Sequence, residues 1–167
     1  MHFDQPVTDL IEQRFSCRTY QSRPIDSEIR DQLAHFLAAT QVGPMDHQAR
    51  FKLVAAHESD SSALKGMGTY GFIKQPAGFI IGASRDQAMS LEDFGYLMEA
   101  IILRATDLGL GTCWLGGTFN RSRFAQEIDL HDDEIIPAVT SVGYIAESPR
   151  RMDQTIRNTA GSDQRMA

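Results

Sequence analysis

Apolar residues recur along the chain with two spacings, one typical of helices and one typical of strands. Val7–Arg14 and the segment that follows Asp26 have the spacing of amphipathic helices. Asp26 or Ser27 is placed to cap the second helix, and Gly43-Pro44 is expected to stop it. One face of this second helix is formed by Ile29, Leu33, Phe36 and Leu37.

The longest periodic segment predicts a central helix. We expect Ser90 to cap it, with Glu92 and Asp93 in the first turn, where negative charge complements the helix dipole. The apolar stripe is wide enough to pack on two sides. It consists of Leu91, Phe94, Leu97, Met98, Ile101, Ile102, Ala105 and Leu108.

Three segments have strand-like patterns: Phe51–Ala56, Ala77–Ala83 and Ile135–Ile145. The second is continuously apolar, as expected for a strand that is buried on both faces. Asn120 is expected to cap a short helix between the last two strands, with Phe124 and Ile128 on its buried face. Strands and helices do not alternate strictly, so the pattern favours an α+β fold over a doubly wound sheet.

Composition fits one globular domain without extensive nucleic-acid or membrane contact. The 167 residues are 42% hydrophobic and 23% charged. A net charge of −6 argues against non-specific binding to nucleic acid or anionic membranes, and any anionic ligand then needs a local basic site. No apolar run approaches a membrane span and the N-terminus does not resemble a signal peptide, so we expect a cytoplasmic protein. Two cysteines are too few for a disulfide framework, and we expect both to be reduced.

The chain becomes polar after Glu147 and contains few large apolar residues from there on. We therefore expect a folded domain over residues 1–147 and a polar C-terminal arm over residues 148–167. The arm is interpreted as an extension, as a segment that folds on a partner, or as the place where a longer protein has been shortened.

Leu108–Gly117 is the most unusual segment, with four glycines around the only tryptophan, Trp114. Glycine gives no packing and costs conformational entropy, so it is retained where the backbone bends sharply or lies close to another group. The pattern alone leaves two interpretations open. One is a tight helix-to-strand turn, and the other is a flat ligand resting on bare backbone.

Arg14 and Arg18 lie four residues apart around Ser16, a spacing that places them on one face if the first helix continues. Guanidinium groups suit phosphate oxygens, and the Ser16 hydroxyl adds a donor. The alternative is a pair of surface arginines neutralised by Asp9 and Glu12.

Other candidate motifs are weak. Gly66–Gly71 is a literal G-x-G-x-x-G, but a polar segment precedes it and a strand follows, so we interpret it as a loop rather than a dinucleotide fingerprint. Cys113 has no basic neighbour in the sequence and is expected to be buried and inert, and Glu99 is expected to be exposed or paired rather than a general acid. No metal site is predicted, because none of the histidines has ligand spacing with another histidine or cysteine. These histidines are His2, His35, His47, His57 and His131.

Taken in order, several segments resemble the nitroreductase family of flavoproteins. Arg14–Tyr20 (R-F-S-C-R-T-Y) resembles the opening R-R-S-x-R-x-Y/F of the family, and Ala38–Pro44 resembles its A-A-x-x-A-P-S turn. Leu108–Phe119 closely resembles its L-G-L-G-T-C-W-L-G-G-F segment, and Val142–Tyr144 resembles its late G-Y-P. Gly68–Gly71 resembles the G-T-Y-G loop of one subgroup.

The resemblance implies an α+β nitroreductase-like fold with a central, mostly antiparallel sheet flanked by helices. It also implies an intertwined homodimer with FMN at the subunit interface. It implies that Arg14, Ser16 and Arg18 hold the FMN phosphate and ribityl chain, and that the backbone after Trp114 faces the flavin ring with an N–H directed at N5. No catalytic side chain is implied, because the cofactor carries the chemistry. The residues implied to bind the cofactor are Arg14, Ser16, Arg18, His47, Trp114, Leu115, Gly116, Gly117 and Arg165.

The chain departs from the family pattern at several positions. His47 lies near a position where the family has Asn, and Phe15 stands where a second basic residue is usual. Arg165 is the candidate for a late phosphate-binding residue, with Arg150 and Arg151 as rivals. The chain also stops without a closing element, which suggests a shortened protein with reduced flavin affinity.

Three functional hypotheses follow. The first is an FMN-dependent oxidoreductase that uses NAD(P)H as co-substrate and reduces a small electron-poor acceptor such as a nitroaromatic or a quinone. The second is a non-catalytic or degenerate flavin-binding homodimer. The third is a homodimeric interaction module without a cofactor, in which the two arginines form surface ion pairs.

Overall fold

The computed structural model describes residues 2–55, 64, 71–117, 119–148, 155–156 and 158–159. The helices within these residues are α1 (Val7–Gln13), α2 (Ser27–Ala39), α3 (Ser90–Asp107) and α4 (Arg121–Ile128). The strands are β1 (Ala49–Ala55), β2 (Gly78–Arg85), β3 (Gly111–Leu115), β4 (Glu134–Ile135) and β5 (Val139–Gly143). None of the helices in this part of the chain has the length and apolar character that crossing a bilayer requires.

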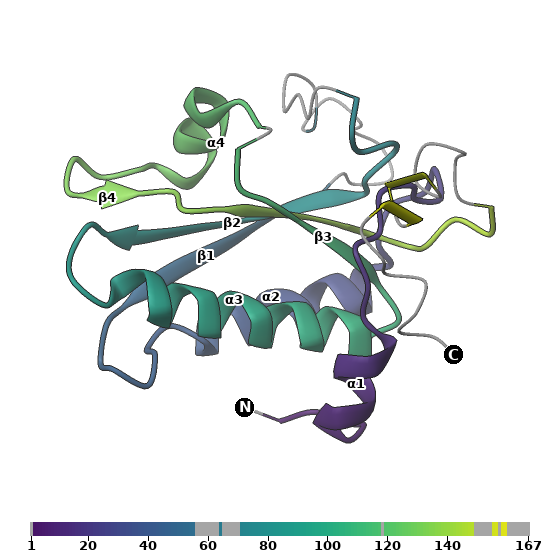
Figure 1. Ribbon diagram of the computed structural model, residues 1–167, viewed down its shortest axis with the longest axis horizontal. Helices are drawn as coiled ribbons and strands as arrows, with labels where there is room; N and C mark the ends of the chain where they lie inside the picture. Colours follow the sequence, from purple (N-terminus) through teal and green to yellow (C-terminus); the bar gives the residue numbers. More distant parts are fainter. Residues whose placement is uncertain are drawn as a thin grey trace.

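The strands form one antiparallel sheet in the order β1-β2-β5-β3, and the short β4 pairs with the end of β2. Figure 1 shows α2 and α3 side by side below one face of this sheet, while α4 lies above the other. The α+β architecture with a mostly antiparallel sheet is therefore confirmed. Strand β2 is central and buried along nearly its whole length, as its continuous apolar pattern predicts.

Each face of the sheet carries its own hydrophobic core. On the face that α2 and α3 cover, the core includes Ile80 and most of the predicted α3 stripe. Leu91 is an exception, since 53% of it is exposed at the solvent side of the first turn. On the opposite face the ring of Phe124 packs edge-on against Phe79 and Phe119, with centroid distances of 5.2 and 5.4 Å.

Two predicted helix starts are confirmed in position, and one is wrong. The Asn120 side chain accepts a hydrogen bond from the Arg123 N–H at 3.3 Å and caps α4. Asp26 occupies the N-cap position of α2, but its carboxylate accepts from the Tyr144 hydroxyl at 2.8 Å and makes no capping bond. The expected cap Ser90 is instead the first residue of α3, which follows Met89 in a left-handed conformation.

Two boundaries also differ from the sequence pattern. Helix α2 ends at Ala39, before Gly43-Pro44, and its C-cap Thr40 is buried. The single strand expected over Ile135–Ile145 is divided into β4 and β5. Pro137 lies between them, and since proline has no N–H to donate to a ladder, the interruption follows from its chemistry.

An ion pair ties the first strand to the fourth. The Arg50 guanidinium donates to both oxygens of Glu134, at 2.7 Å from Nε and 2.5 Å from Nη2. The carboxylate also accepts from the His131 N–H at 3.0 Å. The hydrogen bonds from Arg50, opposed by burial, hold the pKa of the Glu134 carboxyl at about 2, below its ordinary value of 4.5.

This depressed pKa makes a pH-dependent contribution to stability. A carboxyl with a lowered folded-state pKa stabilises fully above its unfolded value near 4.5, and the contribution is lost as the pH falls towards 2. Glu134→Gln is expected to lower the free energy of unfolding by about 2 kcal/mol at pH 7, with the wild-type and variant values converging towards pH 2. Urea unfolding across this pH range measures the difference. Asp133→Asn is the control, because its pair with Arg85 is exposed on both sides and is expected to change stability by less than about 0.5 kcal/mol.

Candidate cofactor-binding site

The segment after α1 runs along the outer edge of β3. Helix α1 ends at Gln13, and Arg14 is already extended with ψ 139°. Ser16 then pairs with Thr112 in a parallel bridge, in which the Cys17 N–H donates to the Thr112 carbonyl at 2.8 Å. The expected placement of Arg14 and Arg18 on one helical face is therefore wrong, because the helix does not reach them. Extended backbone instead puts alternate side chains on one side.

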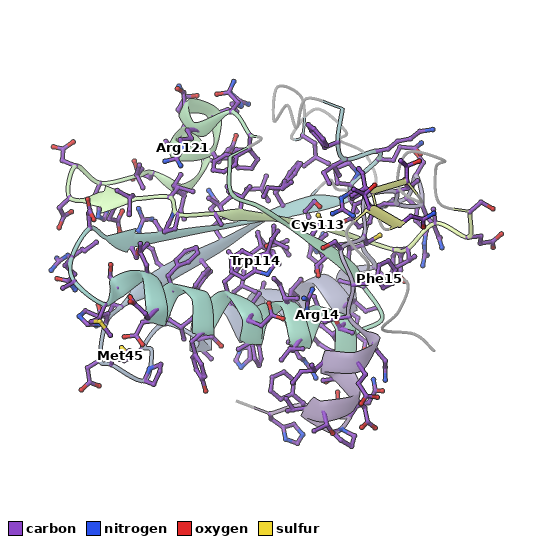
Figure 2. All side chains as sticks on the ribbon, viewed as in Figure 1. Arg14, Phe15, Met45, Cys113, Trp114 and Arg121 are labelled. Atoms are coloured by element: carbon purple, nitrogen blue, oxygen red, sulfur yellow. The ribbon has the colours of Figure 1, made fainter. Side chains whose placement is uncertain are left out.

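Glu99 of α3 joins this segment to the tryptophan strand. Its carboxylate accepts from Arg14 Nε at 2.8 Å and from Trp114 Nε1 at 3.0 Å. Figure 2 shows Arg14 and Trp114 on the side of β3 that faces α3. Glu99 is paired, as expected, but the predicted partners of Arg14, Asp9 and Glu12, are not the residues that neutralise it.

Arg18 completes the group. Its Nη1 donates to the carbonyl oxygen of Ser16 at 3.2 Å, and the residue is half-buried. A neutral carbonyl leaves the positive charge of Arg18 in place, whereas Glu99 offsets that of Arg14. The structure thus brings Arg14, Ser16, Arg18 and Trp114 together at one edge of the sheet. A bridging role for Glu99 was not predicted, and its only sequence signal is an acidic residue in the middle of an apolar helix.

The four glycines of Leu108–Gly117 have different structural roles. Gly109 has φ +75° and makes the turn that leads from α3 to β3, so the tight-turn interpretation applies to it. A Cβ on Gly111 would lie 2.7 Å from Ile145 and 2.9 Å from Cys17, so packing inside the chain requires this glycine. Among the described residues, a Cβ on Gly116 or Gly117 would contact nothing within 4 Å, and both glycines are exposed.

Leu115 is a candidate by its backbone only. Its side chain is 4% exposed and packs on the α4 side of the sheet with Val139, its partner across the ladder. Trp114 points to the α3 side, because successive side chains alternate along a strand. Side-chain contact with a ligand at this edge is therefore open to Trp114 and not to Leu115.

His47 does not join the other candidates. Its backbone N–H and its ring Nδ1 bond to Asp93 at 2.9 and 3.0 Å, which holds the loop before β1 on the first turn of α3. Burial raises the pKa of the Asp93 carboxyl, but hydrogen bonds from the Met45 and His47 backbone lower it by more. Figure 2 shows Met45, which belongs to this loop, near the opposite end of α3 from Arg14.

A separate cleft of about 530 Å³ opens beside the His47 loop. It lies between that loop, the start of β1, the end of β2 and the β4 region. Its charged lining includes Asp46, Arg50, Arg85 and Glu134, and His47 is the single predicted site residue among the lining residues. Both arginines already pair with carboxylates, so the cleft offers no uncompensated positive charge from them.

Some predicted residues lie outside the described part of the chain. These are Arg165, with its rivals Arg150 and Arg151, and the loop residues Gly66–Tyr70. In the residues that are described, no cluster of three or more His, Cys, Asp or Glu has the arrangement of a metal site. Of the expected arm over residues 148–167, the structure describes Ser148 and the helical residues 155, 156, 158 and 159.

Solved structures share this fold. One described as "the oxidoreductase containing FMN" superposes with a TM-score of 0.72 at 21% identity, covering 93% of this chain and 86% of its own. A nitroreductase family protein from Clostridium difficile 630 superposes with a TM-score of 0.65 at 19% sequence identity, covering 92% of both chains. An FMN-dependent nitroreductase from Clostridium difficile R20291 superposes with a TM-score of 0.66 at 18% sequence identity, covering 86% of this chain and 92% of its own. At these identities the similarity shows the fold alone.

The sequence itself matches a family model. Comparison with curated proteins finds no match. The family model described as "Putative TM nitroreductase" matches residues 6–163, which includes the arginine segment, the glycine segment and every described helix and strand. Because this match extends over nearly the whole sequence, the chain belongs to the nitroreductase family.

Proposed function

We propose that the protein is an FMN-dependent oxidoreductase that takes reducing equivalents from NAD(P)H and passes them to a small electron-poor acceptor. The observation that carries the proposal is the edge of β3. There, Arg14, Ser16 and Arg18 lie on the segment beside the strand that leads to Gly116-Gly117, where a Cβ would contact none of the described residues within 4 Å. An anion-binding group next to bare backbone provides the two features that a phosphorylated flat cofactor needs.

The residues present fit FMN. Arg18 keeps its charge and Ser16 adds a hydroxyl, so the segment suits a phosphate in a protein whose net charge of −6 repels anions elsewhere. The open space beside Gly116 and Gly117 leaves room for a ring to approach the main chain. The Glu99 carboxylate fixes the Arg14 and Trp114 side chains relative to each other and so pre-orients the site before a ligand arrives.

Bound FMN supplies hydride transfer through N5, which explains why the chain needs no acid–base pair of its own. The chain positions the cofactor and tunes its surroundings. The backbone N–H groups after Trp114 and the arginines would hold the cofactor and would stabilise negative charge on it. Names of neighbours with the same fold, which include an FMN-dependent nitroreductase, agree with a nitroaromatic acceptor.

We also propose that the active form is a homodimer. Exposed apolar side chains lie on two helices: Val7 and Ile11 of α1 are 41% and 56% exposed, and Leu91 and Tyr96 in the N-terminal half of α3 are 53% and 54% exposed. Burial of such a surface favours association. A second copy also offers a way for the His47 loop to approach the site from which it is separated within one chain.

The test is the visible absorbance spectrum of the purified protein, followed by NAD(P)H oxidation with a quinone and a nitroaromatic. The proposal expects bound flavin and turnover with at least one acceptor. Tight flavin without turnover would instead support the non-catalytic flavin-binding homodimer. A colourless protein that binds no added FMN and oxidises no NAD(P)H contradicts both.

A further inference from the structure

Two cysteines that are far apart in the sequence are neighbours in the fold. Ser16 and Thr112 oppose each other in the parallel bridge, so the next residues along the two segments are Cys17 and Cys113. Neighbouring strands lie about 4.8 Å apart, and a disulfide accommodates Cα separations of about 4.4–6.8 Å. The register therefore gives the two cysteines a backbone spacing that a disulfide can bridge.

Their side chains also point to the same face. Cys113 opposes Ser141 of β5, on the α4 side of the sheet, and both cysteines belong to the core on that side. A Cβ on Gly111, which shares this face of β3, would lie 2.9 Å from the Cys17 Sγ. The missing side chain of Gly111 thus makes room for the Cys17 sulfur beside the strand that carries Cys113.

Tyr20 lies beside both cysteines. The Tyr20 hydroxyl lies 2.7 Å from the Cys17 carbonyl oxygen and 2.8 Å from the Ser141 Oγ, and Ser141 is the ladder partner of Cys113. The two cysteines are 2% and 5% exposed. Such burial excludes a bulky oxidant. The predicted burial of Cys113 is confirmed, whereas its predicted inertness was argued from the sequence without a neighbouring thiol.

We propose that Cys17 and Cys113 form a reversible disulfide when the protein meets a peroxide. One cysteine loses its proton and attacks the peroxide as a thiolate, which breaks the O–O bond and gives a sulfenic acid and hydroxide, and the hydroxide takes up the lost proton to become water. The second thiol then attacks the sulfenic sulfur, forming the S–S bond and releasing a second water. Overall, two S–H bonds are lost and one peroxide is reduced to two waters. The bond ties the arginine segment to β3 through a residue that lies between Ser16 and Arg18. The inference does not depend on FMN binding.

The experiment uses the whole wild-type protein. After treatment with hydrogen peroxide, the protein is unfolded in excess alkylating reagent and digested with trypsin, which cleaves after arginine. We expect a peptide of residues 15–18 joined to one of residues 105–121, absent after reduction with a dithiol. Closing a loop of nearly 100 residues is expected to raise the Tm by about 5–15 °C, reversibly.

Cys17→Ser and Cys113→Ser are the matched controls, and neither is expected to gain the crosslink or the rise in Tm on oxidation. The proposal is overturned if both wild-type cysteines are still alkylated after peroxide treatment. Sulfinic acid on either cysteine without a crosslink overturns it as well, and so does a crosslink that joins two chains rather than one.

Discussion

Replacing Arg14 and Arg18 together by alanine is expected to weaken FMN binding by roughly 100-fold or more while the fold is retained. Each charge-assisted hydrogen bond to a phosphate contributes about 1.5–3 kcal/mol, and about 1.4 kcal/mol corresponds to a tenfold change in affinity. The effect on stability is small, because Arg14 pairs with a Glu99 side chain that is 36% exposed. Flavin fluorescence titration and thermal unfolding measure the two quantities.

Two controls identify the phosphate as the group that is recognised. Riboflavin, which lacks the phosphate, is expected to bind the wild type and the double variant with nearly equal affinity. The variant Arg30→Ala/Arg85→Ala removes the same charge elsewhere, since Arg30 pairs with the exposed Asp31 and Arg85 with Asp133, and it is expected to leave FMN affinity within about threefold. An equal loss of FMN affinity in both double variants would show that net charge matters and that the site does not.

Valine at Gly116 or Gly117 is expected to reduce FMN affinity by roughly 10- to 100-fold without destabilising the chain. A Cβ at either position would contact none of the described residues within 4 Å, so the free energy of unfolding is expected to change by less than about 0.5 kcal/mol. The same side chain obstructs a flat ring that rests on the backbone, and overpacking of this kind costs about 1–3 kcal/mol.

Gly109→Val is the matched control for these substitutions. Gly109 has φ +75°, which a β-branched residue adopts only under strain, so this variant is expected to lose about 2 kcal/mol of stability and about 4–8 °C in Tm. Its effect on FMN affinity, measured below the Tm, is expected to be small. If Gly116→Val and Gly117→Val bind FMN normally, the ring does not lie against this backbone.

The sequence was informative wherever local chemistry decides the structure. The period of apolar residues predicted α3, a continuous apolar run predicted β2, and the carboxamide of Asn120 predicted the start of α4. The α+β class followed from the order of these elements. The end of α2 was predicted less accurately than its start. Gly43-Pro44 indicated that the helix continues to that turn, but the helix ends four residues before Gly43, at Ala39. The division of residues 1–147 from the arm stays a prediction.

The candidate site divides in the same way. Residue types alone offered Arg14, Ser16 and Arg18 as an anion-binding group or as surface ion pairs, and the glycine segment as a tight turn or as bare backbone. The family resemblance implied the cofactor-binding alternative for both, and that assignment stays a prediction. The role of each glycine was decided by the tertiary structure. Gly109 makes a turn, Gly111 leaves room for the Cys17 side chain, and Gly116 and Gly117 are exposed with no described residue within 4 Å of an added Cβ. The pairing of Ser16 with Thr112 and the Glu99 bridge join segments nearly 100 residues apart, and such contacts depend on sheet register and helix packing, which no local pattern encodes.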